Sequence, residues 1–196
     1  MKTQIKIAFK LFIIMTLLTG VAYPLCVTGI SQVIFPLKAN GSQLKNGDTV
    51  IGSLLIGQSF NNDRYFQSRP STVDYQTLPS GASNLSVTSK KLEAQFIERK
   101  RLFLKQNNLK DSAEVPSEML FASASGLDPH ISVKAAELQV QRIAKNRSLN
   151  ASQTEQLQNL IDKVKESRQL GLFGEPKINV LALNFEMDRL FKSKWQ

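Results

Sequence analysis

The sequence predicts an α/β or α+β globular domain tethered by one amino-terminal transmembrane helix. Two observations support this fold class. A run of 27 residues without a charged side chain lies between Lys10 and Lys38, and the rest of the chain alternates between apolar strand-like stretches and segments with helical periodicity. With 42% hydrophobic and 21% charged residues, the composition is typical of a folded protein rather than a disordered one.

The apolar run has the length of a membrane span. At about 1.5 Å per residue, a helix from Leu11 to Val33 would cross a hydrocarbon core of roughly 30 Å with some tilt. A cleaved signal peptide is the alternative, because Gly20-Val21-Ala22 offers small residues at a cleavage site. Apolar sequence continues well past Ala22, which favours an anchor. The predicted organisation is a tail at 1–10, a span at 11–35, a linker at 36–47 and a globular domain at 48–196.

The lysines around the span predict its orientation. Lys2, Lys6 and Lys10 precede it, and only Lys38 and Lys45 follow closely. Positive charge near a span favours the cytoplasmic side. The amino terminus is therefore expected in the cytoplasm and the globular domain outside it.

One face of the span carries small and hydroxyl side chains. These residues recur at spacings of three and four, so they share a side of the helix, where they allow close helix contact and hydrogen bonds between helices. Pro24 would kink the helix and free a backbone carbonyl. The face predicts packing against other membrane helices, although a lone anchor remains an alternative. Its residues are Thr16, Gly20, Tyr23, Val27 and Ser31.

The first half of the globular domain predicts a strand, a loop and a helix. Residues 48–60 are rich in Val, Ile and Leu and are bounded by Asn-Gly and Asn-Asn, which indicates a strand. Residues 69–84 contain Pro, Ser, Gly and Asn with interspersed apolar side chains, which predicts an ordered loop. A helical period runs over 88–106.

The second half predicts three helices and a strand. Apolar spacing favours a helix over 132–147. The Ser152-x-x-Glu155 pattern is typical of a capping box, so a further helix is expected to begin at Ser152 and to end at Leu170-Gly171. The stretch GEPKINVLALN (174–184) predicts a strand, and 185–191 a short helix.

The segment SASGLDPHIS (123–132) raises the question of a hydrolase. It holds the only histidine, His130, beside Asp128, with Ser123 and Ser125 as candidate nucleophiles. A Ser-His-Asp triad requires the acid to orient the imidazole and the imidazole to reach the hydroxyl. Only one residue separates Asp128 from His130, and the chain has no G-x-S-x-G elbow.

A structural role for the same segment fits better. Asp128 would cap a turn or a short helix, Pro129 would occupy the first helical position, and Gly126 would allow a tight bend. His130 is then a structural or partner-contacting residue.

Composition argues against several other functions. One cysteine and one histidine exclude a disulfide framework and make a metal site improbable. A P-loop and a Gly-rich nucleotide fingerprint are both absent, so no tightly bound cofactor is expected. The net charge is +9, but its lysines and arginines are interleaved with acidic residues, so no nucleic-acid partner is expected.

Six sequence blocks resemble one known family. Together with the leading span, they are similar to the C subunit of the bacterial Kdp high-affinity potassium-transporting ATPase. Ala82 and Ser86-Val87 depart from the family pattern, where a second Gly and a Gly-Pro are common. The blocks are SLLIGQSF (53–60), YFQSRPS (65–71), SGASNL (80–85), VPSEMLFASASGLDPHIS (115–132), AAELQVQRIAKNR (135–147) and GEPKINVLALN (174–184).

The resemblance implies a non-catalytic, single-pass subunit of a bacterial inner-membrane complex. Its expected partners are a channel-like potassium-translocating subunit, a P-type ATPase subunit and a small single-span subunit. The family member is regarded as an assembly factor and as a catalytic chaperone that raises the ATP affinity of the ATPase subunit. The family glutamine implicated in that effect matches Gln139.

Cytoplasmic ATP and an external Gln139 are incompatible with direct contact. We therefore expect ATP to be involved only through the complex, by coupling between distant sites. Arg69, Asn84, Asp128 and His130 are candidates for contacting partners or for ordering loops. Two alternatives stay open: a membrane-anchored envelope hydrolase that uses Ser123 or Ser125 with His130, and a binding module released by cleavage.

Overall fold

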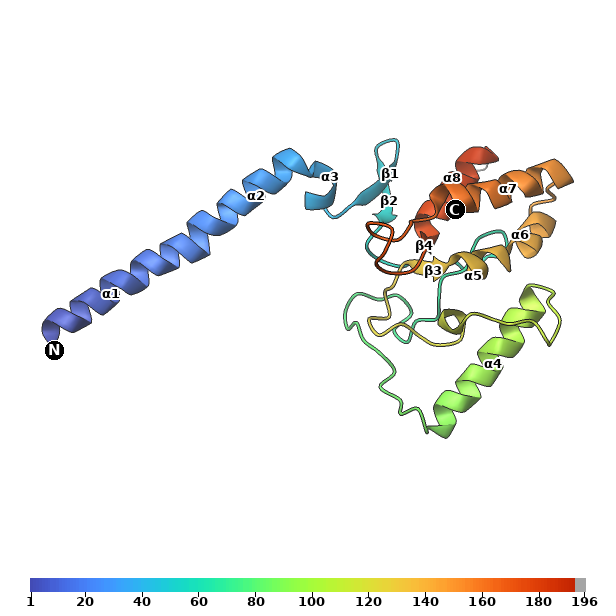
Figure 1. The fold of residues 1–196 in the computed structure, drawn as a ribbon, viewed down its shortest axis with the longest axis horizontal. Coiled ribbons are helices and arrows are strands. Elements are labelled where there is room, and N and C mark those ends of the chain that lie inside the picture. Colours follow the sequence, from blue (N-terminus) through green and yellow to red (C-terminus); the bar gives the residue numbers. More distant parts are fainter. Residues whose placement is uncertain (193–196) are drawn as a thin grey trace. The chain divides into compact units, whose positions relative to one another are not determined.

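The structure is a computed structural model that describes residues 1–192, so the last four residues of the predicted domain 48–196 lie outside the described part. The chain divides into two compact units, one from Met1 to Ile51 and one from Gly52 onward (Figure 1). The limits predicted for the tail, the span and the linker stay predictions.

The first unit begins with one long helix. It comprises α1 (Lys2–Leu17), a π-helical turn η1 (Leu18–Ala22) and α2 (Tyr23–Ile34). The π-helical turn ends two residues before Pro24, which removes a backbone donor from the helix. Beyond it lie α3 (Pro36–Ala39) and a two-stranded sheet. The strands of that sheet are β1 (Gln43–Asn46) and β2 (Thr49–Ser53).

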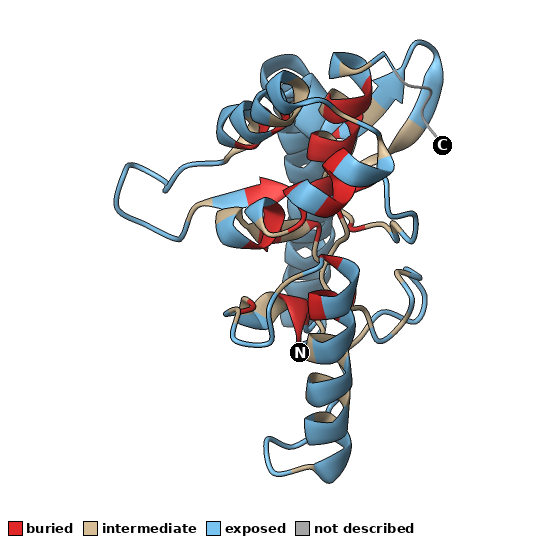
Figure 2. Ribbon diagram, turned by 90° about the vertical axis from the view of Figure 1, so that its right-hand side faces the viewer, coloured by how far each residue is buried: buried red, intermediate tan, exposed pale blue. Residues whose placement is uncertain are grey.

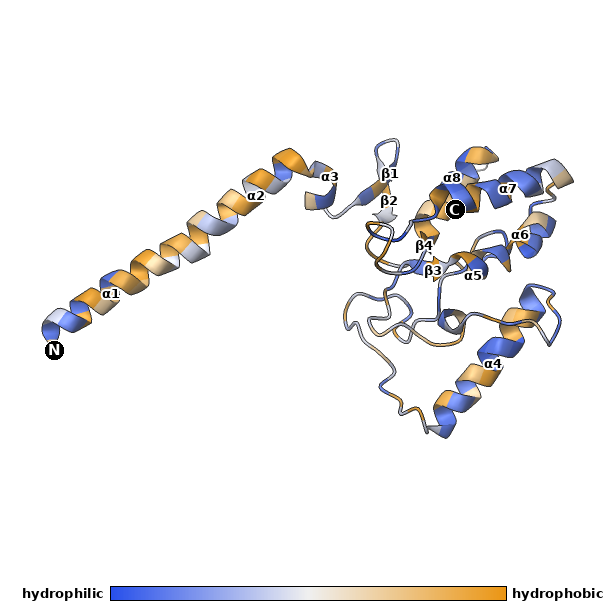
Figure 3. Cartoon of the chain, in the orientation of Figure 1, coloured by the Kyte–Doolittle hydropathy of each residue, from blue (hydrophilic) through white to orange (hydrophobic). Residues whose placement is uncertain are grey.

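The long helix has an apolar surface throughout its central part (Figure 3). Lys2–Ile34 contains a window with a mean hydropathy of 2.0, and no residue of α1, η1 or α2 is buried. Thirty-three residues span about 50 Å as a helix, more than the roughly 30 Å of a bilayer core. By length and composition, this helix is able to cross a membrane.

The second unit mixes helices with one short sheet, and the predicted fold class is confirmed. Strands β3 and β4 are antiparallel and pair Ile131 with Ile178. The elements in chain order are α4 (Lys90–Gln106), η2 (Ser117–Met119), β3 (His130–Ser132), α5 (Val133–Glu137), α6 (Val140–Asn146), α7 (Ala151–Val164), β4 (Lys177–Asn179) and α8 (Val180–Leu190).

The core of this unit lies among α5 to α8 and the β3–β4 pair, where Figure 2 shows buried residues clustered. Phe66, from a segment without regular secondary structure, is fully buried within it. Phe103 and Leu104 at the end of α4 join the same core, whereas Ile97 of the same helix is exposed. The core therefore depends on an irregular segment as well as on helices.

Two strand predictions are largely wrong. The segment predicted at 48–60 is a strand only at Thr49–Ser53, because the chain then turns and the Gly57 N–H donates to the Leu127 carbonyl at 2.7 Å. The segment predicted at 174–184 is a strand only at Lys177–Asn179. Helix α8 then begins at Val180, since the Asn179 side chain caps it by accepting from the Ala182 N–H.

Several helix boundaries also differ from the predictions. The helix predicted at 132–147 is interrupted between α5 and α6. Helix α7 ends at Val164 rather than at Leu170-Gly171, because the chain leaves it for a bridge between Glu166 and Lys177. Its capping box uses Asn150 and Gln153 instead of Ser152 and Glu155. Pro129 does not begin a helix either; β3 intervenes, and the Ser132 side chain caps α5.

Candidate functional site

A segment without regular secondary structure, residues 63–67, is held by side chains instead of by a neighbouring strand. Its backbone carbonyls and amides pair with polar groups of α6 and α8 and with residues that flank α6. We call this set the buried clamp. Its members are Gln139, Arg142, Arg147, Asn184 and Asp188.

Gln139, the residue that matches the family glutamine, is fully buried in the clamp. Its Oε1 accepts from the Gln67 N–H at 2.7 Å and from Arg142 Nη2 at 2.8 Å. Its Nε2 donates to the carbonyls of Gln67 at 3.3 Å and Ala135 at 3.2 Å. A glutamine amide has two donors and two acceptor sites, and all four are used here. This geometry favours a structural role for Gln139 over nucleotide contact.

The two arginines of the clamp are also buried. Arg142 donates to the carbonyls of Asp63 at 2.6 Å and Tyr65 at 3.0 Å, and to Asn107 Oδ1 at 3.0 Å. Burial lowers the pKa of Arg142. Arg147 pairs with Asp188 at 2.7 Å, with side chains only 3% and 4% exposed. These charges are therefore taken out of water and compensated within the protein.

Helix α8 completes the clamp. Asn184 exchanges two hydrogen bonds with the backbone of Phe66, at 2.8 and 2.9 Å, in the manner of a neighbouring strand. The Tyr65 hydroxyl donates to Asp188 Oδ2 at 2.8 Å, and the Arg147 guanidinium lies 4.8 Å from the Tyr65 ring centroid. The clamp thereby fixes the path of the YFQSRPS segment.

Asp128 and His130 of the SASGLDPHIS segment form a second polar group with Arg69 and Glu166. We call these four residues the turn cluster. Arg69 Nη1 donates to Asp128 Oδ2 at 2.7 Å, and the His130 N–H donates to Asp128 Oδ1 at 3.0 Å. The His130 ring lies 3.4 Å from Asp128 Oδ1 and 3.5 Å from Glu166 Oε1. The bonds from His130 and from Arg69 hold the pKa of Asp128 well below its usual range.

The turn around Asp128 packs closely against two other loops. A Cβ on Gly57 would lie 2.7 Å from the Asp128 carbonyl oxygen, which is too close for any residue but glycine. Gly126 has φ of +72° and lies against Val73 and Gly81. Asp128 thus caps a turn, as the sequence predicts, and Gly126 provides the bend.

The hydrolase alternative receives no support from the serines. Ser125 Oγ accepts from the Leu127 N–H, and Ser123 is buried with its N–H directed to the Pro70 carbonyl. Within residues 1–192, no hydrogen bond joins either serine hydroxyl to His130. The imidazole instead faces two carboxylates. Across the same residues, no group of three His, Cys, Asp or Glu side chains is placed to hold a metal ion.

The remaining predicted residues lie apart from the turn cluster. Asn84 is exposed in its loop and has φ of +51°, a conformation that asparagine tolerates. On the predicted packing face of the apolar helix, no residue is fully buried. Ser31 is partly buried, and the others are exposed: Thr16, Gly20, Tyr23, Pro24 and Val27.

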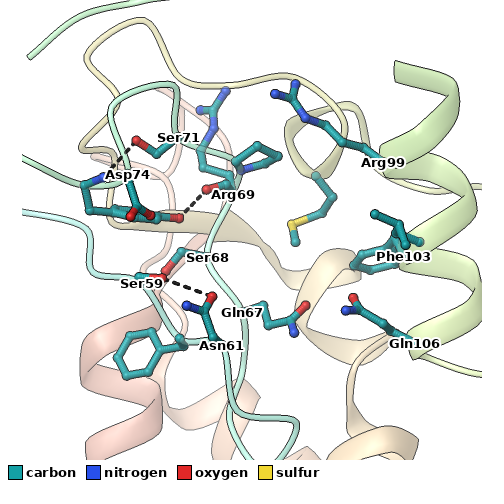
Figure 4. A pocket seen from close by; sticks show the side chains of 15 residues that line it. Ser59, Asn61, Gln67, Ser68, Arg69, Ser71, Asp74, Arg99, Phe103 and Gln106 are labelled. Atoms are coloured by element: carbon teal, nitrogen blue, oxygen red, sulfur yellow. Dashed lines mark hydrogen bonds between the residues drawn. The ribbon is translucent and has the colours of Figure 1, made fainter. Parts of the chain in front are cut away.

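A cleft of about 290 Å³ lies where the loop at 67–75 meets α4 (Figure 4). Arg69, Arg99 and Asp74 line it, together with Phe103 and other apolar side chains. The Tyr75 hydroxyl donates to the Arg69 carbonyl, and burial raises the pKa of Tyr75 to about 12. Arg69 was predicted as a site residue, but Arg99 was not, because in the sequence it is indistinguishable from the other cations of an amphipathic helix.

Sequence analysis also missed four of the five clamp residues as a polar set. The available signal was the spacing of Asn184 and Asp188, two polar residues four apart in the apolar stretch VLALNFEMD. Both are buried on α8. Polar side chains within an apolar helix are retained where they have buried partners.

Comparison with known proteins identifies the family. The model of the KdpC family, described as the c chain of K⁺-transporting ATPase, matches residues 5–189. Proteins named potassium-transporting ATPase KdpC subunit are 42% identical in Caldanaerobacter subterraneus and 43% in Leptospira interrogans, each over 95% of this chain and 95% and 94% of the relative. One from Rhodospirillum rubrum is 47% identical over 94% of both chains. This chain therefore belongs to the KdpC family, the C subunits of potassium-transporting ATPases.

Proposed function

We propose that this chain is the non-catalytic accessory subunit that stabilises a bacterial potassium-transporting ATPase complex from outside the cytoplasmic membrane. The observation that carries this proposal is the state of Gln139. The residue that the family resemblance links to ATP is fully buried, and its amide is saturated by contacts with the chain's own backbone and with Arg142. It positions the loop at 65–71.

The proposed partners are the channel-like potassium-translocating subunit, the P-type ATPase subunit and the small single-span subunit. Support comes from the apolar surface of Lys2–Ile34, of which no residue is buried by the chain itself. A face with Thr16, Gly20 and Ser31 allows another membrane helix to approach closely. We expect this helix to anchor the subunit in the cytoplasmic membrane and to contact partner helices.

The proposed effect on ATP affinity is indirect. Three lysines before the span favour a cytoplasmic amino terminus and an external globular unit, whereas ATP is cytoplasmic. Any influence on nucleotide affinity is then a coupling free energy transmitted through the membrane helix or the channel-like subunit. The subunit itself breaks no bond in this scheme.

The topology is tested by fusing alkaline phosphatase, which is active only outside the cytoplasm, after Gln196. We expect an active fusion, and a fluorescent protein that folds only in the cytoplasm should stay dark at the same position. Intact mass of the chain extracted in detergent should show an uncut amino terminus. A fluorescent fusion together with an inactive alkaline phosphatase fusion would contradict the proposed topology. An intact mass that lacks residues 1–22 would contradict the proposed membrane anchor.

The role of Gln139 is tested by Gln139→Leu, with Gln141→Leu as the matched control because Gln141 is exposed in the first turn of α6, which begins directly after Gln139. Gln139→Leu leaves the Gln67 N–H and carbonyl without partners, so we expect a loss of about 1–3 kcal/mol in the free energy of unfolding. Any rise in the KM for ATP should accompany that loss. A several-fold rise in the KM with unchanged stability would indicate direct nucleotide contact.

A further inference from the structure

Arg99 connects two adjoining hollows on the globular unit. The first is the cleft of about 290 Å³ beside Arg69, and the second, of about 350 Å³, shares Ser71 and Arg99 with it. Figure 4 shows the guanidinium groups of Arg69 and Arg99 pointing toward the same end of the cleft. The lining of the two hollows carries three cationic side chains, including Lys91, against the single carboxylate of Asp74.

The two arginines have unused hydrogen-bonding capacity at this place. Arg69 Nη1 is paired with Asp128, but its buried Nε has no hydrogen-bond partner. Arg99 Nη1 donates to the Leu120 carbonyl at 3.0 Å, and across residues 1–192 no carboxylate oxygen lies within 4 Å of its guanidinium. A guanidinium carries five N–H donors in a planar fork. Burial also lowers the pKa of Arg99, with no nearby carboxylate to offset it.

The surroundings specify what kind of anion fits. Leu102, Phe103 and Met119 form an apolar wall beside the arginines. A free inorganic anion would leave that wall uncovered, whereas an Asp or Glu side chain followed by an apolar residue would satisfy both features. Guanidinium and carboxylate also match in bidentate geometry. Asp74 would repel a carboxylate, so the arginine end is the favourable approach.

We propose that the Arg69–Arg99 cleft receives a carboxylate-bearing segment of a partner subunit in the potassium-transporting ATPase complex. This inference rests on the proposed accessory function and adds the chemistry of one contact. Arg99 supplies the charge that the partner carboxylate neutralises, and Arg69, held by Asp128, lines the same end.

The test uses the complete complex in detergent and a zero-length carbodiimide, which joins an amine to a carboxylate in direct contact. The R99K variant supplies the amine at the cleft. R101K is the matched control, since Arg101 lies on the same helix, is exposed and pairs with Glu98 at 2.6 Å. We expect peptide mass spectrometry to find a link between position 99 and an Asp or Glu of a partner subunit for R99K only.

A second measurement tests the charge of Arg99 without a cross-linking reagent, by following how fast the chain dissociates from its partner subunits. R99Q should dissociate from the immobilised complex about tenfold faster than the wild type, because it leaves the partner carboxylate buried without a counter-charge. R101Q should dissociate at the wild-type rate.

The outcomes separate the two proposals. If wild-type and R99K chains retain their partner subunits but position 99 links only within its own chain or not at all, the cleft inference is overturned and the accessory function stands. If R99Q loses a bound anionic lipid but its partner subunits dissociate at the wild-type rate, the cleft inference is also overturned. If the wild-type chain retains no partner subunit, both proposals fall.

Discussion

The buried clamp and the turn cluster use the same kinds of side chain in different surroundings. Both contain an arginine–aspartate pair at 2.7 Å. In the clamp, Arg147 and Asp188 are 3% and 4% exposed, whereas in the turn cluster Arg69 and Asp128 are 22% and 31% exposed. The two ion pairs therefore have the same length but very different exposure to solvent.

That difference assigns different roles to the two groups. Removing one partner of a buried charge pair leaves an uncompensated charge and is strongly destabilising, while partly exposed pairs contribute little. The clamp therefore determines whether residues 63–67 join the core. The turn cluster adds little stability, but it remains accessible to partners and to changes in pH.

The largest effect is expected from Arg142→Met, which breaks the clamp. The variant keeps a long side chain but removes the Arg142 donor from the Asp63 and Tyr65 carbonyls and from Asn107 Oδ1, and it removes one of the two donors to Gln139 Oε1. We expect a loss of about 3–5 kcal/mol in the free energy of unfolding, measured by urea denaturation of the full chain in mild detergent. Arg101→Met, at an exposed ion pair, should leave the free energy of unfolding close to the wild-type value. Similar losses for both variants would contradict the comparison.

A smaller loss is expected from Gly57→Ala, which tests the backbone of the turn cluster instead of its side chains. The new Cβ would lie 2.7 Å from the Asp128 carbonyl oxygen, so one of the two loops has to move. We expect about 1–3 kcal/mol of destabilisation and faster amide exchange at residues 125–130. Gly81→Ala is the control, because no atom lies within 4 Å of a Cβ at that position. A neutral Gly57→Ala would show that this packing is loose.

The features that were predicted correctly depend on residues that are close together in the sequence. The long apolar run, the amphipathic pattern of α4 and the turn at Gly126–Asp128 are local, and the structure contains all three. The second part of helix α8 agrees with the helix predicted at 185–191, but residues 180–184 were predicted as a strand. Seven of the eleven residues of α8 are buried, so no polar face reveals the helical period.

The bonding partners of the clamp residues could not be predicted from local patterns. Gln139 reaches a residue 72 positions earlier in the chain, and Asn184 one that lies 118 positions away. Such contacts depend on the tertiary path of the chain, and an apolar window has no period that reveals them. Gln139 was a candidate only through the family resemblance, and its burial could not be predicted from local patterns for the same reason.

Asp128→Asn should produce a smaller effect that depends on pH. Because the folded-state pKa of Asp128 lies below its unfolded value of about 3.9, the ionised side chain stabilises the fold above pH 4. That contribution is lost as the pH falls from about 4 toward the folded-state pKa. We expect Asp128→Asn to lower stability by roughly 1 kcal/mol at pH 7 and to flatten the acid limb of a plot of unfolding free energy against pH. Parallel curves for variant and wild type would refute this assignment.

The smallest effect is expected from His130→Ala. The imidazole lies 3.4 and 3.5 Å from two partly exposed carboxylates, distances at the outer limit of a hydrogen bond. Its backbone N–H, which bonds Asp128, is unchanged by the substitution. We therefore expect a loss below about 1 kcal/mol, an assembled complex and unchanged ATP turnover, measured on the complex purified in detergent. Ser123→Ala should likewise leave turnover unchanged. If His130→Ala kept the complex intact yet abolished turnover, the histidine would have a chemical role, and the turn cluster would no longer be a purely structural and partner-contacting group.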